Sequence, residues 1–119
     1  MAPITIYQKP TCSTCRQVLK LVQESGQAFT AVNYYQTPLS KTKLKALLKK
    51  GGLKARDVLR AKEEKYKALG LAKADKSEDE LIELMVANPD LLQRPLVEQA
   101  QTVILARPAE TVKQLWKGS

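Results

Sequence analysis

Two cysteines, Cys12 and Cys15, are the residues of this sequence best suited to chemistry. They are the only cysteines among 119 residues and lie three positions apart, within residues 9–16. A short strand is predicted to lead into this segment and a helix to begin in it, which places Cys12 at a helix N-terminus. Free N–H groups and the helix dipole stabilise a thiolate there, lowering cysteine pKa values from about 8.5 to roughly 3.5–7.5. We therefore expect Cys12 to be a nucleophile.

The rest of the composition narrows what a Cys-x-x-Cys pair can do. The chain has no histidine, which removes Cys-His catalysis of the protease type. Zinc commonly needs four Cys or His ligands, so we expect no structural metal site within one chain. Any activation of the thiol must come from the backbone, the helix dipole or basic side chains. The composition therefore favours a redox function for the Cys-x-x-Cys pair.

Length and hydropathy predict one domain, spanning residues 1–119, that does not cross a membrane. The apolar content is 44%, and no apolar run approaches the roughly 20 residues that a membrane helix needs. The first residues lack the basic and apolar regions of a signal peptide, which predicts a cytoplasmic protein. In that reducing compartment a cysteine pair is more often catalytic than a structural disulfide.

The positive charge is concentrated in the middle of the sequence. The net charge is +8, and residues 41–76 hold 13 of the 20 basic residues but only four of the 12 acidic ones. This segment lacks interleaved aromatic residues and any DNA-reading motif, so we expect no direct binding of nucleic acid. Its lysines are interpreted as a solvated helix face that could steer a small anion or an acidic partner.

Hydrophobic periodicity predicts the order β-α-β, several helices, then β-β-α. Gly26 is expected to end the first helix, and Ser77 with Glu80 forms a predicted capping box. Pro108 is expected at the first position of the last helix. The predicted strands are residues 4–7, 28–34, 94–98 and 102–106, and the helical stretch about 40–88 includes a helix over 62–69.

Motifs spread over nearly the whole chain resemble the glutaredoxin-coupled arsenate reductase family. The matching stretches are residues 4–7, Pro10 with Cys12, residues 58–60, residues 66–71, Asn88-Pro89, Arg94-Pro95 and Arg107-Pro108. The resemblance implies an α/β thioredoxin-like fold, with a four-stranded mixed sheet and a helical insertion between the second strand and the Arg94-Pro95 strand.

The resemblance also implies an activity and a site. Cys12 would attack arsenate, which Arg60, Arg94 and Arg107 would hold, and Pro95 would follow a cis peptide bond. Glutathione would serve as the reducing co-substrate and glutaredoxin would regenerate the enzyme, with no bound cofactor. Guanidinium groups suit this substrate because they bind oxyanions bidentately.

Two residues depart from that family and keep alternatives open. Gln8 stands where such reductases usually have histidine, and Cys15 stands where they usually lack cysteine. A Cys-x-x-Cys here resembles the Spx-type redox regulators, which bind RNA polymerase, with Cys15 as a resolving thiol. Cys15 also shares a predicted buried helix face with Val18 and Val22, so it could be a core residue. A general dithiol oxidoreductase, or recycling by thioredoxin, are further alternatives.

Overall fold

The computed structural model describes residues 3–60, 63–71 and 76–117. Two compact units make up the chain: Met1–Thr37 with Arg94–Ser119, and Pro38–Gln93. We call them the sheet unit and the helical unit. The helical unit contains residues 40–88, the predicted insertion, and a few more residues on each side.

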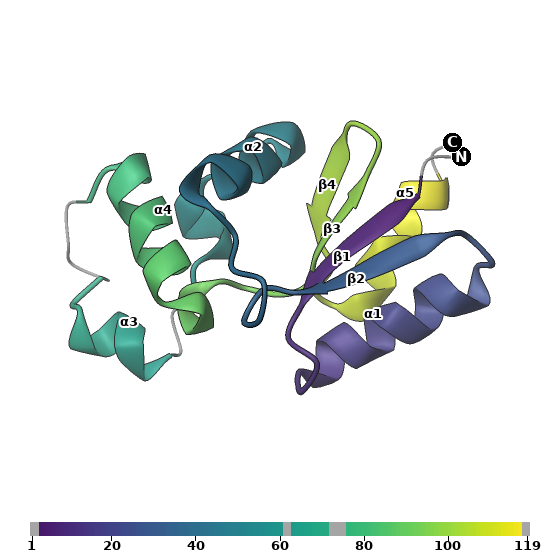
Figure 1. The fold of residues 1–119 in the computed structure, drawn as a ribbon, viewed down its shortest axis with the longest axis horizontal. Helices are drawn as coiled ribbons and strands as arrows, with labels where there is room; N and C mark the ends of the chain where they lie inside the picture. The colour runs from purple at the N-terminus through teal and green to yellow at the C-terminus, as the bar shows by residue number, and fades with distance from the viewer. Residues whose placement is uncertain (1–2, 61–62, 72–75, 118–119) are drawn as a thin grey trace. The chain divides into compact units, whose positions relative to one another are not determined.

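The sheet unit contains a four-stranded mixed sheet (Figure 1). Its strand order is β2-β1-β3-β4, in which β1 and β2 are parallel and the other neighbours are antiparallel. The helix α1 (Ser13–Glu24) connects the two parallel strands. The predicted fold class is therefore confirmed. The strands are β1 (Ile4–Gln8), β2 (Phe29–Asn33), β3 (Leu96–Gln99) and β4 (Thr102–Leu105).

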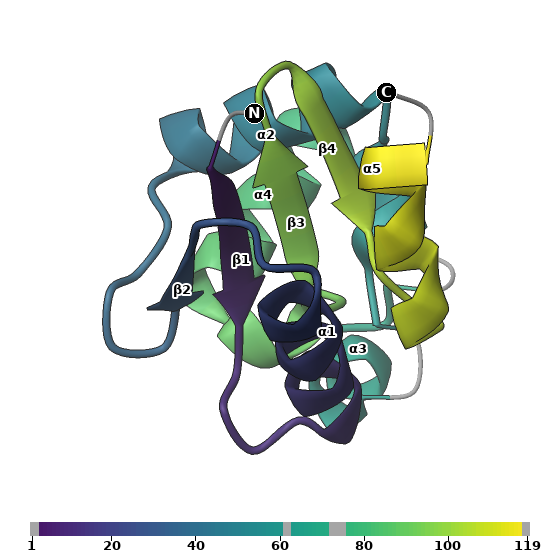
Figure 2. The same ribbon diagram turned by 90° about the vertical axis from the view of Figure 1, so that its right-hand side faces the viewer.

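One face of this sheet is covered by α1 and by the last helical segment, which comprises the 3₁₀ helix η3 (Ala109–Lys113) and α5 (Gln114–Lys117) (Figure 2). Alternate strand residues point to the same face, so Ile4 and Ile6 meet α1 together. Each fully buried aliphatic side chain contributes about 1.5–3 kcal/mol. The buried members of this core are Ile4, Ile6, Val18, Val22, Val97, Ala106, Ala109 and Val112.

The third strand starts two residues later than predicted. It begins at Leu96 rather than at Arg94, and its first pair is Leu96 with Leu105. Proline has no N–H group for the ladder, so Pro95 takes part only through its carbonyl, which accepts from the backbone N–H of Ala106 at 3.0 Å. Arg94 therefore lies just outside the sheet.

The final helix also differs from the prediction. Pro108 is not its first residue but lies before it, with an extended backbone at ψ 167°. The N–H of Thr111 donates to the carbonyl of Pro108 at 3.0 Å, an i to i+3 bond that tightens the first turn into a 3₁₀ helix. The α-helical part is confined to Gln114–Lys117.

The helical unit consists of short helices whose ends have capping residues. Ser40 caps α2 (Lys41–Gly51) by accepting from the N–H of Lys43 at 3.0 Å, and Gly52 ends that helix at φ 63°. The capping box of Ser77 and Glu80 is present. Residue 62, where one helix was predicted to begin, lies outside the described residues. The elements are α2 (Lys41–Gly51), η1 (Ala55–Val58), α3 (Glu64–Ala68), α4 (Glu78–Ala87) and η2 (Pro89–Leu91).

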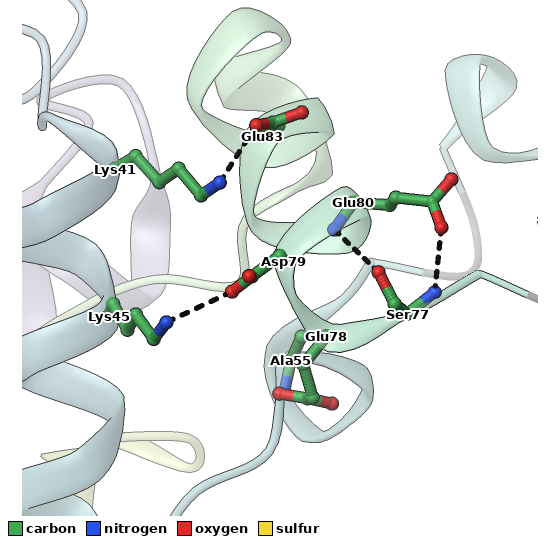
Figure 3. A network of polar contacts seen from close by, with 8 residues as sticks. All are labelled: Lys41, Lys45, Ala55, Ser77, Glu78, Asp79, Glu80 and Glu83. Carbon is green, nitrogen blue, oxygen red and sulfur yellow. Dashed lines mark hydrogen bonds and ion pairs between the residues drawn. The ribbon is translucent and has the colours of Figure 1, made fainter.

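Carboxylates on α4 tie this helix to α2 and η1 (Figure 3). Lys41 pairs with Glu83 at 2.8 Å, and Lys45 pairs with Asp79 at 3.1 Å. Glu78 accepts from the N–H of Ala55, the first residue of η1, at 2.9 Å.

Within residues 3–60, 63–71 and 76–117, no helix has the length and apolar character needed to span a membrane.

Candidate active site

The cysteine loop is built by a turn that leads directly into α1. The backbone N–H of Cys12 donates to the carbonyl of Lys9 at 3.0 Å, with Pro10 at the second position, where its fixed φ suits a turn. Cys12 is the N-cap of α1, and its Sγ accepts from the N–H of Cys15 at 3.4 Å. Cys12 thus lies at a helix N-terminus, as predicted, and its sulfur satisfies one of the free N–H groups there.

Sheet topology explains why distant segments meet beside this loop. Because β1 and β2 are parallel, both end at the same edge of the sheet. The antiparallel pairs Tyr7 with Leu96 and Leu96 with Leu105 bring the start of β3 and the end of β4 to that edge. Arg94 precedes β3 and Arg107 follows β4, so both arginines are delivered to the cysteine loop.

Both arginines act on Cys12. The Nη1 atom of Arg107 lies 4.0 Å from Cys12 Sγ and donates to the carbonyl of Arg94 at 3.0 Å. The hydrogen bonding and the positive charge of Arg94 lower the pKa of Cys12. Only 7% of Arg94 is exposed, and its Nε has no hydrogen-bond partner among the described residues. A buried donor without a partner costs about 1–3 kcal/mol, which an oxyanion would recover by accepting from it.

These contacts favour the thiolate form of Cys12. Partial burial raises the pKa of Cys12, but hydrogen bonds from the backbone and thiol of Cys15 lower it, as do the hydrogen bond and charge of Arg94. The net pKa lies below its ordinary value. A thiolate at neutral pH is the form that attacks an electrophile.

Cys15 has the opposite environment. Its side chain is completely buried on the inner face of α1, together with Val18 and Val22. Burial and the neighbouring Cys12 together raise the pKa of Cys15 to about 12, against the lowering effects of the Lys9 backbone and Arg94. Cys15 is therefore a protonated thiol, and neither cysteine is in a disulfide.

Pro95 and Arg60 are the two remaining residues predicted for the site. The peptide bond from Arg94 to Pro95 is cis, and so is the one from Arg107 to Pro108. Arg60 belongs to the helical unit, where its N–H donates to the carbonyl of Leu91 at 2.7 Å. Its Nε pairs with Glu63 at 3.1 Å. Four of the predicted site residues therefore lie in the sheet unit: Cys12, Cys15, Arg94 and Arg107. Arg60 lies in the helical unit.

Sequence reasoning missed three residues around Arg94. The Nη1 atom of Arg94 lies 3.5 Å from the hydroxyl oxygen of Tyr35, and Tyr34 raises the pKa of this arginine through its hydroxyl group. Lys9 Nζ lies 4.8 Å from the centre of the Tyr35 ring. Two consecutive tyrosines at the end of a strand were the available signal.

In the described part of the chain, no three His, Cys, Asp or Glu side chains gather in a way that could hold a metal ion.

A mixed sheet in this order, with a cysteine at the start of the helix after the first strand, defines a thioredoxin-like protein. The model of the ArsC family matches residues 7–115, and the chain belongs to that family. The solved arsenate reductase of Vibrio cholerae superposes with a TM-score of 0.90 at 35% identity, covering 95% of this chain and 97% of that one.

Sequence comparison finds relatives with and without an assigned activity. The arsenate reductase of Escherichia coli strain K12 is 36% identical over 115 residues, which is 97% of this chain and 82% of the reductase. The uncharacterized protein YfgD of the same strain is 40% identical over 113 residues, or 94% of this chain and 95% of YfgD. The family is therefore clear, and the substrate of this chain is a separate question.

Proposed function

We propose that this protein is an arsenate reductase in which the Cys12 thiolate attacks arsenate held by Arg94 and Arg107. The observation that carries the proposal is the Arg107 guanidinium 4.0 Å from the Cys12 sulfur, beside an Arg94 side chain whose charge lowers the pKa of Cys12. These cations stabilise the thiolate, and they suit a compact dianion whose oxygens accept several N–H bonds. The arsenate reductases among the relatives support this choice of oxyanion.

The reaction balances as a two-electron reduction. The Cys12 sulfur forms a bond to arsenic and one arsenate oxygen leaves as water. Two external thiols from the reducing system are then oxidised to a disulfide and give arsenic two electrons, the sulfur–arsenic bond breaks with protonation of Cys12, and arsenite leaves. We assign glutathione as the reductant and glutaredoxin as the recycling partner, because Cys15 is buried and protonated at neutral pH. A cytoplasmic location, where glutathione is abundant, is part of this proposal.

We also propose Arg60 as a third ligand of arsenate, because the sequence resembles glutaredoxin-coupled reductases at this position. In the helical unit its Nε pairs with Glu63. An anion ligand of this kind should lose affinity when the planar guanidinium is replaced by an ammonium group. Arg60→Lys should therefore raise the KM for arsenate, whereas a purely structural ion pair with Glu63 would tolerate the lysine.

The test is arsenate-dependent oxidation of NADPH with glutathione and glutaredoxin, and separately with thioredoxin. Turnover with glutathione and glutaredoxin by the wild type and by Cys15→Ser supports the proposal. Turnover with thioredoxin that is lost in Cys15→Ser would assign Cys15 as a resolving thiol instead. If neither reducing system supports turnover, the protein is not an arsenate reductase.

A dithiol role is the second candidate, because the N–H of Cys15 lies 3.4 Å from Cys12 Sγ. In that case the two thiols lose two electrons and two protons to an oxidant and form a Cys12–Cys15 disulfide. A general dithiol oxidoreductase would then reduce a disulfide substrate. An Spx-type regulator would instead co-purify with RNA polymerase and show no arsenate turnover.

A further inference from the structure

Two consecutive tyrosines, Tyr34 and Tyr35, follow β2 and have no role in the chemistry described so far. Neighbouring residues of a strand point to opposite faces, but a turn begins here. The side chain of Asn33 accepts from the N–H of Tyr35 at 3.0 Å, and its carbonyl accepts from the N–H of Thr37 at 2.9 Å. This turn lets the two rings approach each other, with their centres 5.1 Å apart.

The tyrosines gather around the buried guanidinium of Arg94. The Tyr35 hydroxyl lies 3.5 Å from Arg94 Nη1, and the ring of Tyr34, which is only 3% exposed, has its centre 5.1 Å from that of Tyr35. Burial lowers the pKa of Arg94, but Tyr34, Tyr35 and Cys12 raise it, and the net pKa is above its ordinary value. Arg94 thus stays a cation between the two phenols and the Cys12 sulfur.

The chemical nature of these partners matters. A phenol is a neutral hydrogen-bond acceptor, so it can fix the orientation of a guanidinium without cancelling its charge. A carboxylate would fix the orientation but would also compete with any anion for the cation. Arg60 illustrates that case, because its Nε is paired with Glu63. The tyrosines therefore leave the charge of Arg94 available to the Cys12 thiolate and to a bound oxyanion.

Lys9 adds a second cation to the same aromatic pair. Its Nζ lies 4.8 Å from the centre of the Tyr35 ring, within the range of a cation–π contact. Lys9 also belongs to the turn that holds Cys12, through its carbonyl. The Tyr35 side chain thus meets Lys9 with its face and Arg94 with its hydroxyl group.

We propose that Tyr34 and Tyr35 are positioning residues, which orient the Arg94 guanidinium toward the Cys12 sulfur and toward an oxyanion bound there. The anion part of this inference rests on the proposed function, and the thiolate part does not. The titratable and charged groups facing Cys12 are Cys15 from α1, Arg94 before β3 and Arg107 after β4. Of these three groups, Arg94 lies 3.5 Å from the Tyr35 hydroxyl, so an Arg94→Ala background tests whether the effect of the tyrosines passes through it.

The test uses Tyr34→Phe, Tyr35→Phe and the double variant, which lose the hydroxyl groups and keep the rings. Tyr7→Phe is the matched control: Tyr7 is a buried residue of the same unit, and its hydroxyl donates to Glu98 at 3.1 Å. The readouts are the pH profile of Cys12 alkylation by iodoacetamide, followed by mass spectrometry, and the arsenate concentration that halves this rate. Circular dichroism and thermal unfolding report whether each variant is folded.

We expect the double variant to shift the alkylation midpoint upward by about 1 pH unit, since a misplaced Arg94 stabilises the thiolate less. The arsenate concentration for half protection should rise roughly fivefold, the effect of one ordinary hydrogen bond. Tyr7→Phe should change neither value. In an Arg94→Ala background the tyrosine substitutions should have no further effect, which a general loss of packing would not reproduce.

Wild-type midpoints in the folded double variant, or an equal shift in Tyr7→Phe, would overturn the inference. A tyrosine effect that persists in Arg94→Ala would also overturn it. Should the double variant not fold, Tyr35→Phe decides by itself, because Tyr35 is only half-buried. Absence of arsenate protection in the wild type would refute the proposed function, whereas the pH profile would still test the positioning role.

Discussion

Arg94 in the sheet unit and the lysines of α2 in the helical unit lie in opposite environments. Arg94 is 7% exposed, lies 3.5 Å from the Tyr35 hydroxyl and lowers the pKa of Cys12. Lys41 and Lys45, in the helical unit, have side chains 40% and 61% exposed and pair with carboxylates. Residues 41–76 hold most of the positive charge of the chain. The comparison teaches that burial and position, rather than the number of charges, decide where a thiolate is stabilised.

The strongest way to break this comparison is to remove the nucleophile. Cys12→Ser should lower arsenate-dependent turnover at least about 1,000-fold, because a hydroxyl group is far less ionised than this thiol at neutral pH. The initial rate of coupled NADPH oxidation measures it. Lys49→Ala, an exposed position at the end of α2, is the control and should retain wild-type turnover. Activity of Cys12→Ser within tenfold of the wild type would rule out Cys12 as the nucleophile.

The next largest effect concerns the arginines of the sheet unit. Arg94→Lys or Arg107→Lys should lower kcat/KM for arsenate about 100-fold, because an ammonium group cannot reproduce the guanidinium contacts with the sulfur and the oxyanion. Steady-state kinetics at varied arsenate concentration measure this ratio. The same kinetics for Lys49→Ala, a charge removed from the helical unit, should match the wild type. Equal losses in the two units would contradict the comparison.

The pH dependence of alkylation sharpens the contrast between the two thiols. Since the pKa of Cys12 is lowered, its thiolate forms as the pH rises through a value below the ordinary one, and the midpoint of its alkylation rate should lie below that of a free cysteine. The pKa of Cys15 is about 12, so Cys15 should stay protonated and unlabelled at pH 8. Peptide mass spectrometry after iodoacetamide treatment distinguishes the sites. Labelling of Cys15 at the same rate would show that its burial does not protect it.

The smallest expected effect lies in the ion pairs between α2 and α4. Lys45→Ala removes the partner of Asp79, but both side chains are more than half exposed, and exposed pairs contribute little. We expect unchanged turnover and a small decrease in the urea midpoint of unfolding, which should shrink further at high salt because of screening. A large, salt-independent loss of stability would mean that this pair has a structural role.

Much of the fold was predictable because its signals are local. The apolar spacing of Val18 and Val22 marks the buried face of α1, and the capping box of Ser77 and Glu80 marks the start of α4. The end of the chain was less predictable. Whether Pro108 stands inside or before a helix depends on the i to i+3 bond to Thr111, and a proline in the sequence fits both cases.

Some residues of the candidate site were also predictable from local signals, and others were not. Cys12 was predictable from a loop that opens a helix, and the structure places it there. Tyr34 and Tyr35 were not, because their approach to Arg94 depends on the turn at Asn33 and on the pairing of β1 with β3. Residues distant in the sequence meet only through strand register. No periodicity in the sequence specifies which side chains meet beside the cysteine loop.

The most direct test is protection of Cys12 from iodoacetamide by arsenate, measured in the wild type and in Arg94→Lys at pH 7. The proposal predicts that arsenate slows alkylation of Cys12 in a saturable way in the wild type and that Arg94→Lys needs at least about 10-fold more arsenate. Sulfate at equal ionic strength controls for screening. Alkylation that is unaffected by arsenate, or equally protected in Arg94→Lys, would contradict an oxyanion site built from Cys12 and Arg94.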